Sequence, residues 1–155
     1  MNQLYDKSML KIMQIADRSS QMSLNRIEQI RAFAREGKFT RIGIAHCITF
    51  TREAEIIKQY LEKDFQVYIV DCKYGRLSKK ELLGENSSRI LCNPAGQAQY
   101  LNEKQTDLNI SIGLCVGHDM IFNQKSEAPV TSVFTKDFTN NNNPAQAVLA
   151  IRREL

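Results

Sequence analysis

Two patterns of apolar residues divide the chain. In the first part, apolar side chains recur at the spacing of helices, which predicts one helix over Leu4–Ala16 and a second that follows an N-cap at Ser23 and stops at Gly37. Farther along, short apolar runs rich in small and β-branched residues alternate with helical stretches. The change predicts N-terminal helices over 1–37 and a sheet core over 40–155, within a single domain.

Four of the short apolar runs predict β-strands: RIGIAHC, QVYIVDC, LNISIGLCV and PVTSVFTKD. Helical stretches separate them, and two of these begin with an Asn-Pro pair, in which the asparagine can cap the helix and the proline fits its first turn. Strands that alternate with helices predict a parallel sheet covered on both faces. We therefore expect an α/β fold, a three-layer, Rossmann-like parallel sheet of about four strands flanked by helices, with an N-terminal helical extension.

The four cysteines fall at corresponding places in this pattern. Cys47 and Cys72 end the first two strands, Cys115 lies near the end of the third, and Cys92 immediately precedes a helix. Parallel strands share one carboxyl edge, and open α/β sheets bind ligands there, where the strand order reverses. In the strand order 2-1-3-4, Cys47 and Cys115 would face each other across that point. We expect all four cysteines to converge at this edge.

The spacing of the cysteines narrows the chemistry. It contains no C-x-x-C, which argues against a zinc ribbon and against a thioredoxin-type motif. Thiolates donated singly from separate loops suit an iron–sulfur cluster or zinc. The leading hypothesis is therefore a metal-binding protein, with the four thiolates of Cys47, Cys72, Cys92 and Cys115 as ligands.

Three other interpretations remain open. The protein could be a metal-free thiol redox or sulfur-handling protein, in which Cys92, at the positive end of a helix dipole, is the nucleophile and Cys47 or Cys115 resolves it. It could be a non-enzymatic module that holds a small anion at the two Asn-Pro helix N-termini. The cysteines could also be plain packing residues, since free cysteine is often buried as a small hydrophobe.

Other polar residues collect beside the same strand ends. His118 and Asp119 follow the third strand and are the candidate catalytic or substrate-side groups, although Asp119 could simply cap the helix that follows. For Lys136 and Asp137 we expect a solvated pair. Gly96, early in a helix, predicts the close approach of a ligand or another backbone.

Composition and charge restrict the class of protein. The 21 Lys and Arg and 17 Asp and Glu give a formal charge of +4, but the two signs are interleaved, which disfavours nucleic acid as a partner. No signal peptide and no 18-residue apolar run occur, so we expect a cytoplasmic protein without a membrane partner. Thiols stay reduced in that compartment, which disfavours structural disulfides. A small-molecule partner, a homo-oligomer and an enzymatic activity are all left open.

Several blocks together carry a resemblance. CNPAGQAQYLN, TDLNISIGLCVGHDMIF and SEAPVTSVFTKD resemble successive blocks of a prokaryotic family of predicted metal-binding proteins, the domain of unknown function eighteen-forty-seven. The resemblance extends from residue 23 to about 150. It implies a small α/β protein with a metal site at the four cysteines, His118 and Asp119 in matching blocks, and no established reaction.

The sequence also departs from this family. Members usually begin with an additional cysteine-rich segment that this chain lacks, and commonly carry a histidine where this chain has Asn142. The family's phenylalanine before the first cysteine is His46 here. These departures predict an altered ligand set or the loss of one metal site.

Overall fold

The computed structural model describes residues 4–152, in which four parallel strands form one sheet. The strands are β1 (Arg41–His46), β2 (Gln66–Asp71), β3 (Leu108–Ile112) and β4 (Val130–Phe134). The helices are α1 (Lys7–Ser19), α2 (Arg26–Glu36), α3 (Thr51–Leu61), α4 (Lys79–Leu83), α5 (Pro94–Glu103), α6 (His118–Lys125) and α7 (Pro144–Ile151), with short 3₁₀ turns at Ile48–Phe50 and Tyr74–Arg76. The expected α/β class is confirmed, and the strand order is β2-β1-β3-β4, the order that the convergence of Cys47 and Cys115 requires.

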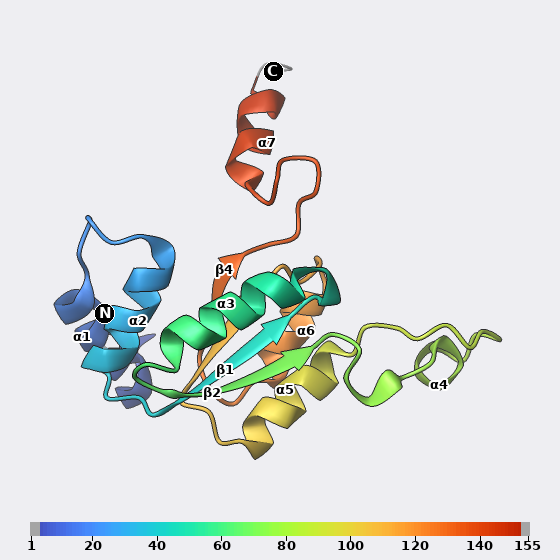
Figure 1. Cartoon of the computed structure of the whole chain (residues 1–155), viewed down its shortest axis with the longest axis horizontal. Helices are drawn as coiled ribbons and strands as arrows, with labels where there is room; N and C mark the ends of the chain where they lie inside the picture. The colour runs from blue at the N-terminus through green and yellow to red at the C-terminus, as the bar shows by residue number, and fades with distance from the viewer. Residues whose placement is uncertain (1–3, 153–155) are drawn as a thin grey trace.

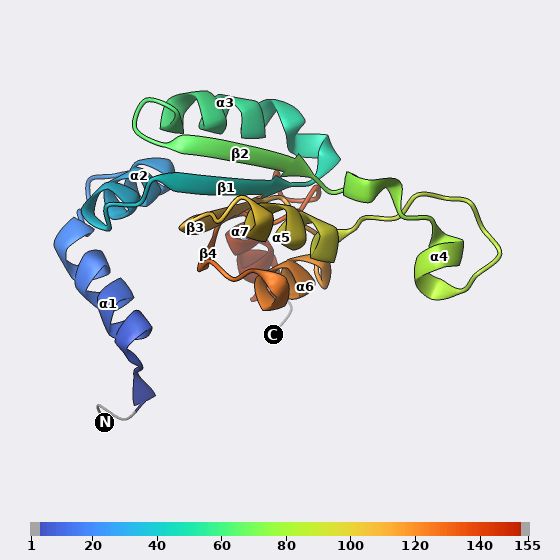
Figure 2. The same ribbon diagram turned by 90° about the horizontal axis from the view of Figure 1, so that it is seen from below.

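The sheet is covered on both faces, as Figure 2 shows. On one face, α2 and α3 pack against it, and Ile44 and Ile110 are completely buried there with the apolar side of α3. On the other face, α5 and α6 bury Leu101 and Phe122. The continuous apolar runs of β1 and β3 follow from this arrangement, because a central parallel strand has no solvent-facing side.

The N-terminal helices start later than the sequence pattern predicts. The first begins at Lys7 rather than Leu4, after Asp6, whose carboxylate accepts a hydrogen bond from the Met9 N–H. The second is capped by Asn25 and not by Ser23: Asn25 accepts from the Glu28 N–H while the Glu28 carboxylate accepts from the Asn25 N–H. This reciprocal capping box provides hydrogen-bond acceptors for two backbone N–H groups at once. Ser23, two residues upstream, does not form such a box with Glu28.

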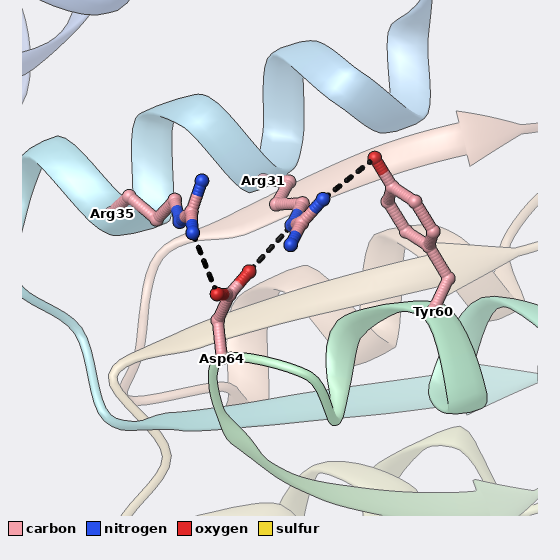
Figure 3. A network of polar contacts seen from close by, with 4 residues as sticks. All are labelled: Arg31, Arg35, Tyr60 and Asp64. Atoms are coloured by element: carbon pink, nitrogen blue, oxygen red, sulfur yellow. Dashed lines mark hydrogen bonds and ion pairs between the residues drawn. The ribbon is translucent and has the colours of Figure 1, made fainter.

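A polar clamp fixes α2 to the end of α3 (Figure 3). Arg31 and Arg35 of α2 both contact the carboxylate of Asp64, Arg35 at 2.8 Å, and Arg31 also donates to the Tyr60 hydroxyl at 3.2 Å. The Arg31 guanidinium further lies over the Tyr60 ring, 4.8 Å from its centroid. We call these four residues the clamp, and they hold the N-terminal helices against the sheet core.

The last helix differs from the expected pattern. None of the described residues of α7 is buried, and Figure 1 shows the helix beyond β4, away from the sheet. Its asparagine N-cap at Asn143 makes no side-chain hydrogen bond, in contrast to the equivalent Asn93 of α5. Among the described helices, none combines the length and apolarity needed to cross a membrane.

Candidate functional site

The carboxyl edge of the sheet brings the four cysteines together. Cys47 directly follows β1, Cys72 directly follows β2, Cys115 comes three residues after β3, and Cys92 stands two residues before α5. Because β1 pairs in parallel with both β2 and β3, these strand ends lie at one edge. A backbone hydrogen bond of 2.8 Å from the Asn93 N–H to the Cys72 carbonyl ties the Cys92 segment to the end of β2.

Cys72 and Cys92 form the first pair. Their sulfur atoms lie 3.6 Å apart, and the Lys73 ammonium lies 3.7 Å from the Cys92 sulfur while it donates to the Ile90 carbonyl at 3.0 Å. Cys72 is 3% exposed and Cys92 is half-buried. Burial and the neighbouring thiol of Cys92 raise the pKa of Cys72 to about 12, although its sulfur also accepts a hydrogen bond from the Ile48 N–H. The pair is therefore asymmetric, with one buried protonated thiol and one half-buried thiol beside a cation.

Cys47 and Cys115 form a second group around Lys136. Burial opposes ionisation of Cys47, but the Lys136 ammonium and the Thr49 hydroxyl, 3.5 Å from its sulfur, outweigh it and lower the pKa of the thiol. Burial opposes the charged form of Lys136 as well, and its proximity to the Cys47 and Cys115 sulfurs nevertheless raises the pKa of its ammonium. A backbone hydrogen bond from Lys136 to the Leu114 carbonyl holds it beside the end of β3. The expected solvated pair of Lys136 and Asp137 is therefore wrong for Lys136.

Asp137 has other partners. Its carboxylate accepts hydrogen bonds from the backbone N–H and the side-chain amide of Asn140, at 3.1 and 2.9 Å, and its own N–H donates to the Asn142 side chain. The polar loop between β4 and α7 folds around this carboxylate. Asp137 thus organises the loop, and Lys136 is left to face the thiols.

The cysteines gather as two groups and not as one set of four ligands. Within residues 4–152, no three side chains among His, Cys, Asp and Glu are arranged to hold a metal ion. The contact between Cys72 and Cys92 supplies two neighbouring sulfurs. The edge therefore offers a close dithiol and a lysine-associated second pair.

His118 and Asp119 contribute mainly through their backbone. Both N–H groups donate to the Cys115 carbonyl, at 3.0 and 3.1 Å, which starts α6 directly behind that cysteine. The Asp119 carboxylate accepts from the Met120 N–H, and the N-cap of the helix is Gly117 rather than Asp119. Among the described residues, neither side chain makes a hydrogen bond to a cysteine sulfur, so their catalytic role stays a prediction.

One buried polar residue beneath the site, Gln97, was not predicted from the sequence as a functional candidate. Gln97 of α5 is completely buried, and its amide nitrogen donates to the carbonyls of His46 and Val70, which ties the ends of β1 and β2 together. Its amide oxygen has no hydrogen-bond partner among the described residues. The signal that could have singled out Gln97 is a polar side chain among the small residues of a sheet-covering helix.

The expected crowding at Gly96 has a local cause. A side chain there would lie 2.3 Å from the amide nitrogen of Asn93, whose oxygen accepts the Gly96 N–H at 2.9 Å. The neighbour is the helix cap itself. The N-terminus of α5 is thereby partly occupied by its own asparagine, which weakens the interpretation of this helix end as an anion site.

Comparison with known proteins finds relatives of this chain, and none of them has a stated function. Residues 1–133 match a family described as a protein of unknown function, DUF1847. An uncharacterized protein of the archaeon Methanocaldococcus jannaschii is 40% identical over 131 residues, which are 82% of this chain and 68% of the archaeal protein. No solved structure matches. The archaeal relative agrees with the prokaryotic family that the sequence blocks resemble, and neither comparison names a ligand or a reaction.

Proposed function

The chain belongs to the DUF1847 family, and since that family has no stated function, we propose from the chain's own residues that it is a thiol–disulfide redox protein. The dithiol is Cys72 and Cys92. The observation that carries the proposal is the 3.6 Å contact between their two sulfur atoms. A disulfide bond is about 2.05 Å long, so a modest approach of the two side chains closes it.

The asymmetry of the pair assigns the two roles. The thiolate is the attacking form of cysteine, and the attacking sulfur must be accessible to the small disulfide. Cys92 is half-buried and lies beside the Lys73 ammonium, whereas Cys72 is almost completely buried and its pKa is raised to about 12. Cys92 is therefore the entering nucleophile. Cys72, rather than Cys47 or Cys115, is the resolving thiol for Cys92.

The reaction is the exchange with a disulfide of a low-molecular-weight thiol. The Cys92 thiolate attacks one sulfur of that disulfide, its S–S bond breaks, one small thiolate leaves and takes up a proton, and a mixed disulfide forms at Cys92. Cys72 then loses its proton and attacks the Cys92 sulfur, and the second small thiol leaves. Two electrons and two protons pass from the protein to the small disulfide.

The test uses oxidised glutathione on the fully reduced protein, followed by alkylation of the free thiols and mass-spectrometric peptide mapping. We expect a Cys72–Cys92 disulfide that dithiothreitol reverses. Cys92→Ser should prevent it, and Cys72→Ser should leave glutathione attached to Cys92. Cys47→Ser is the matched control, because it removes a buried cysteine of the same edge and should leave the Cys72–Cys92 disulfide intact. The proposal is contradicted if no Cys72–Cys92 disulfide forms at any time after oxidised glutathione is added.

Metal binding is the second candidate, and the same contact favours it. Two thiolates on one tetrahedral zinc, each with a bond of about 2.3 Å, lie about 3.8 Å apart, close to the 3.6 Å between Cys72 and Cys92. The fit stops at two ligands, because no group of three potential ligands is gathered anywhere in residues 4–152. Cys47 and Cys115 would have to turn toward the pair to complete a zinc or iron–sulfur site.

Anaerobic purification and metal analysis separate the two candidates. Stoichiometric zinc or iron that is lost in both Cys72→Ser and Cys115→Ser favours the four-cysteine metal site, because the dithiol function does not need Cys115. Metal-free protein that cycles between the dithiol and the disulfide supports the redox proposal and rejects the metal site.

A further inference from the structure

The order of the strands sets the order of the cysteines along the sheet edge. Cys72 ends β2, Cys47 ends β1 and Cys115 follows β3, and these strands are consecutive in the sheet. Neighbouring strands lie about 4.8 Å apart. The Cys92 sulfur lies 3.6 Å from the Cys72 sulfur, and among the described residues it makes no hydrogen bond to Cys47 or Cys115. The sequence of thiols across the edge is therefore Cys92, Cys72, Cys47 and Cys115, a spatial order that differs from their order in the chain.

Burial differs between the inner and the outer thiols of this order, which suggests a path. The two inner thiols, Cys72 and Cys47, are 3% and 4% exposed, whereas the two outer thiols, Cys92 and Cys115, are half-buried. A soluble oxidant or reductant thus has access to the two ends and not to the middle. The two ends also lie over different strands, β2 and β3.

The two inner thiols are held side by side by the backbone. The last cross-strand pair of β1 and β2 is His46 with Asp71, so Cys47 and Cys72 are the next residues of the two strands. The Ile48 N–H, one residue beyond Cys47, donates to the Cys72 sulfur at 3.4 Å. These contacts bring the Cys72 sulfur onto the turn that begins at Cys47.

The second half of the edge has its own cation. Lys136 lies close to both the Cys47 and the Cys115 sulfurs, as Lys73 lies close to Cys92. A cation beside each pair can balance the thiolate that exchange produces there. The proposed function of the first pair leaves the second pair without a role.

Building on the proposed function, we infer that the Cys72–Cys92 disulfide is passed along the edge to Cys47 and Cys115, so that the chain is a disulfide relay with two separate thiol exits. The Cys47 thiolate attacks the Cys72 sulfur, the Cys72–Cys92 bond breaks, and Cys92 leaves as a thiolate beside Lys73. Cys115 then loses its proton and attacks the Cys47 sulfur, and Cys72 leaves and takes up a proton. The disulfide moves by two exchanges, two electrons move the opposite way, and no further oxidant is consumed.

The sequence makes this relay easy to follow. Each cysteine lies on a different tryptic peptide, because a Lys or Arg separates every consecutive pair of them in the chain. Reduced wild-type protein is oxidised with one equivalent of oxidised glutathione, freed of the reagent, and alkylated after increasing times. Peptide mapping should show the Cys72–Cys92 disulfide first and a Cys47–Cys115 disulfide that grows at its expense.

Single variants trap the intermediate. Cys115→Ser should accumulate a Cys47–Cys72 disulfide with Cys92 free to alkylation, and Cys47→Ser should stop at Cys72–Cys92. In Cys72→Ser, the Cys47–Cys115 disulfide should form at least tenfold more slowly, because its supply is interrupted. Thermal unfolding of each variant shows whether it has folded, and the wild-type time course does not depend on any variant.

The outcomes separate the relay from the proposed function. A stable Cys72–Cys92 disulfide with no Cys47–Cys72 or Cys47–Cys115 linkage at any time overturns the relay and leaves the redox function standing. Formation of Cys47–Cys115 in Cys72→Ser at the wild-type rate also overturns it, because the second pair then reacts independently. If Cys72 and Cys92 never form a disulfide, the proposed function itself fails.

Discussion

The clamp and the cysteine edge are both places where distant segments meet, but they treat charge in opposite ways. In the clamp, two arginines share one carboxylate, and Arg31 also contacts the hydroxyl and ring of Tyr60 (Figure 3). At the cysteine edge, Lys73 and Lys136 have no carboxylate partner among the ion pairs of residues 4–152 and lie beside thiols instead. The cations of the clamp are matched with a carboxylate, and the cations of the edge lie beside thiols, whose thiolate forms they favour.

The difference indicates what holds each region. The clamp connects α2 to α3 through side chains. The edge is held by backbone hydrogen bonds between strand ends, from Cys47 to Ile112 at 3.1 Å and from Gly113 to Phe134 at 2.8 Å. Since neither of these two bonds uses a cysteine side chain, the thiols can ionise and exchange without breaking them.

The largest effect on stability should come from the backbone of the edge, at Gly113. Its φ is +60°, and a side chain there would lie 2.1 Å from the ring of Phe50, which is buried and packs edge-to-face on Phe134. Left-handed strain and overpacking together should make Gly113→Ala cost about 3 kcal/mol or more in the free energy of unfolding. Urea unfolding measures this loss.

Gly117→Ala is the matched control. Its φ is +85°, but a side chain there would meet no atom within 4 Å. Only the conformational strain remains, so the cost should be about 1–2 kcal/mol. Equal losses for the two variants would show that packing on Phe50 does not hold the edge.

The clamp should show its contribution through pH. Hydrogen bonds from Arg31 lower the pKa of Asp64, and burial acts in the opposite direction. The positive charges of Arg31 and Arg35 lower it further, so that the pKa lies below its ordinary value. The stabilisation is therefore present above the unfolded pKa, about 3.9, and is lost as the pH falls through the lower folded value. We expect Asp64→Asn to lower the thermal midpoint by several degrees at neutral pH, and the difference from wild type to shrink in acid.

Glu62→Gln is the control for the clamp. Glu62 is a more exposed carboxylate that reaches Lys58 at 3.8 Å, and such surface pairs contribute little. Its thermal midpoint should follow that of the wild type across the same pH range. An Asp64→Asn variant with the pH profile of the wild type would show that the clamp does not depend on a charged carboxylate. The contrast in charge between the clamp and the cysteine edge would then be lost.

The start of α2 gives a smaller effect that tests a corrected assignment. Asn25 makes the capping box with Glu28, so Asn25→Ala should cost about 1 kcal/mol. Ser23→Ala, at the N-cap that the sequence pattern predicts, should change the free energy of unfolding by only a few tenths. Chemical unfolding of the two variants decides between the caps, and a larger loss for Ser23→Ala would restore the original assignment.

The sequence predicts the scaffold of the site better than its contacts. Hydrophobic periodicity predicts the strands and the parallel sheet, and an Asn-Pro pair correctly predicts the cap of α5. Counting residues to a strand end does not give the direction of a side chain beyond it. Cys115 lies past a left-handed glycine, Gly113, so strand alternation no longer sets its position.

The position of Lys136 was unpredictable for a related reason. It follows β4, and its contact with the thiols depends on a backbone hydrogen bond to Leu114, which belongs to a different strand end. The uncovered position of α7 is a further limit, because its apolar sequence predicts a helix but contains nothing that says what the helix packs against. Local pattern determines elements, and long-range contacts determine which side chains meet.

The smallest effect on stability, and the sharpest test of the unmatched charge, should come from Lys136→Met. Loss of the ammonium removes the main influence that favours the thiolate over burial, so the pKa of Cys47 should rise while the thermal midpoint changes little. The ultraviolet absorbance of thiolate, followed against pH in a Cys72→Ser, Cys92→Ser, Cys115→Ser background, reports Cys47 alone. Lys73→Met in the same background is the control, because Lys73 contacts Cys92 and not Cys47, and should leave the titration where it was. If Lys136→Met does not move the titration, or lowers the thermal midpoint as much as Asp64→Asn, then Lys136 serves the fold as the clamp does, and the contrast between the two regions fails.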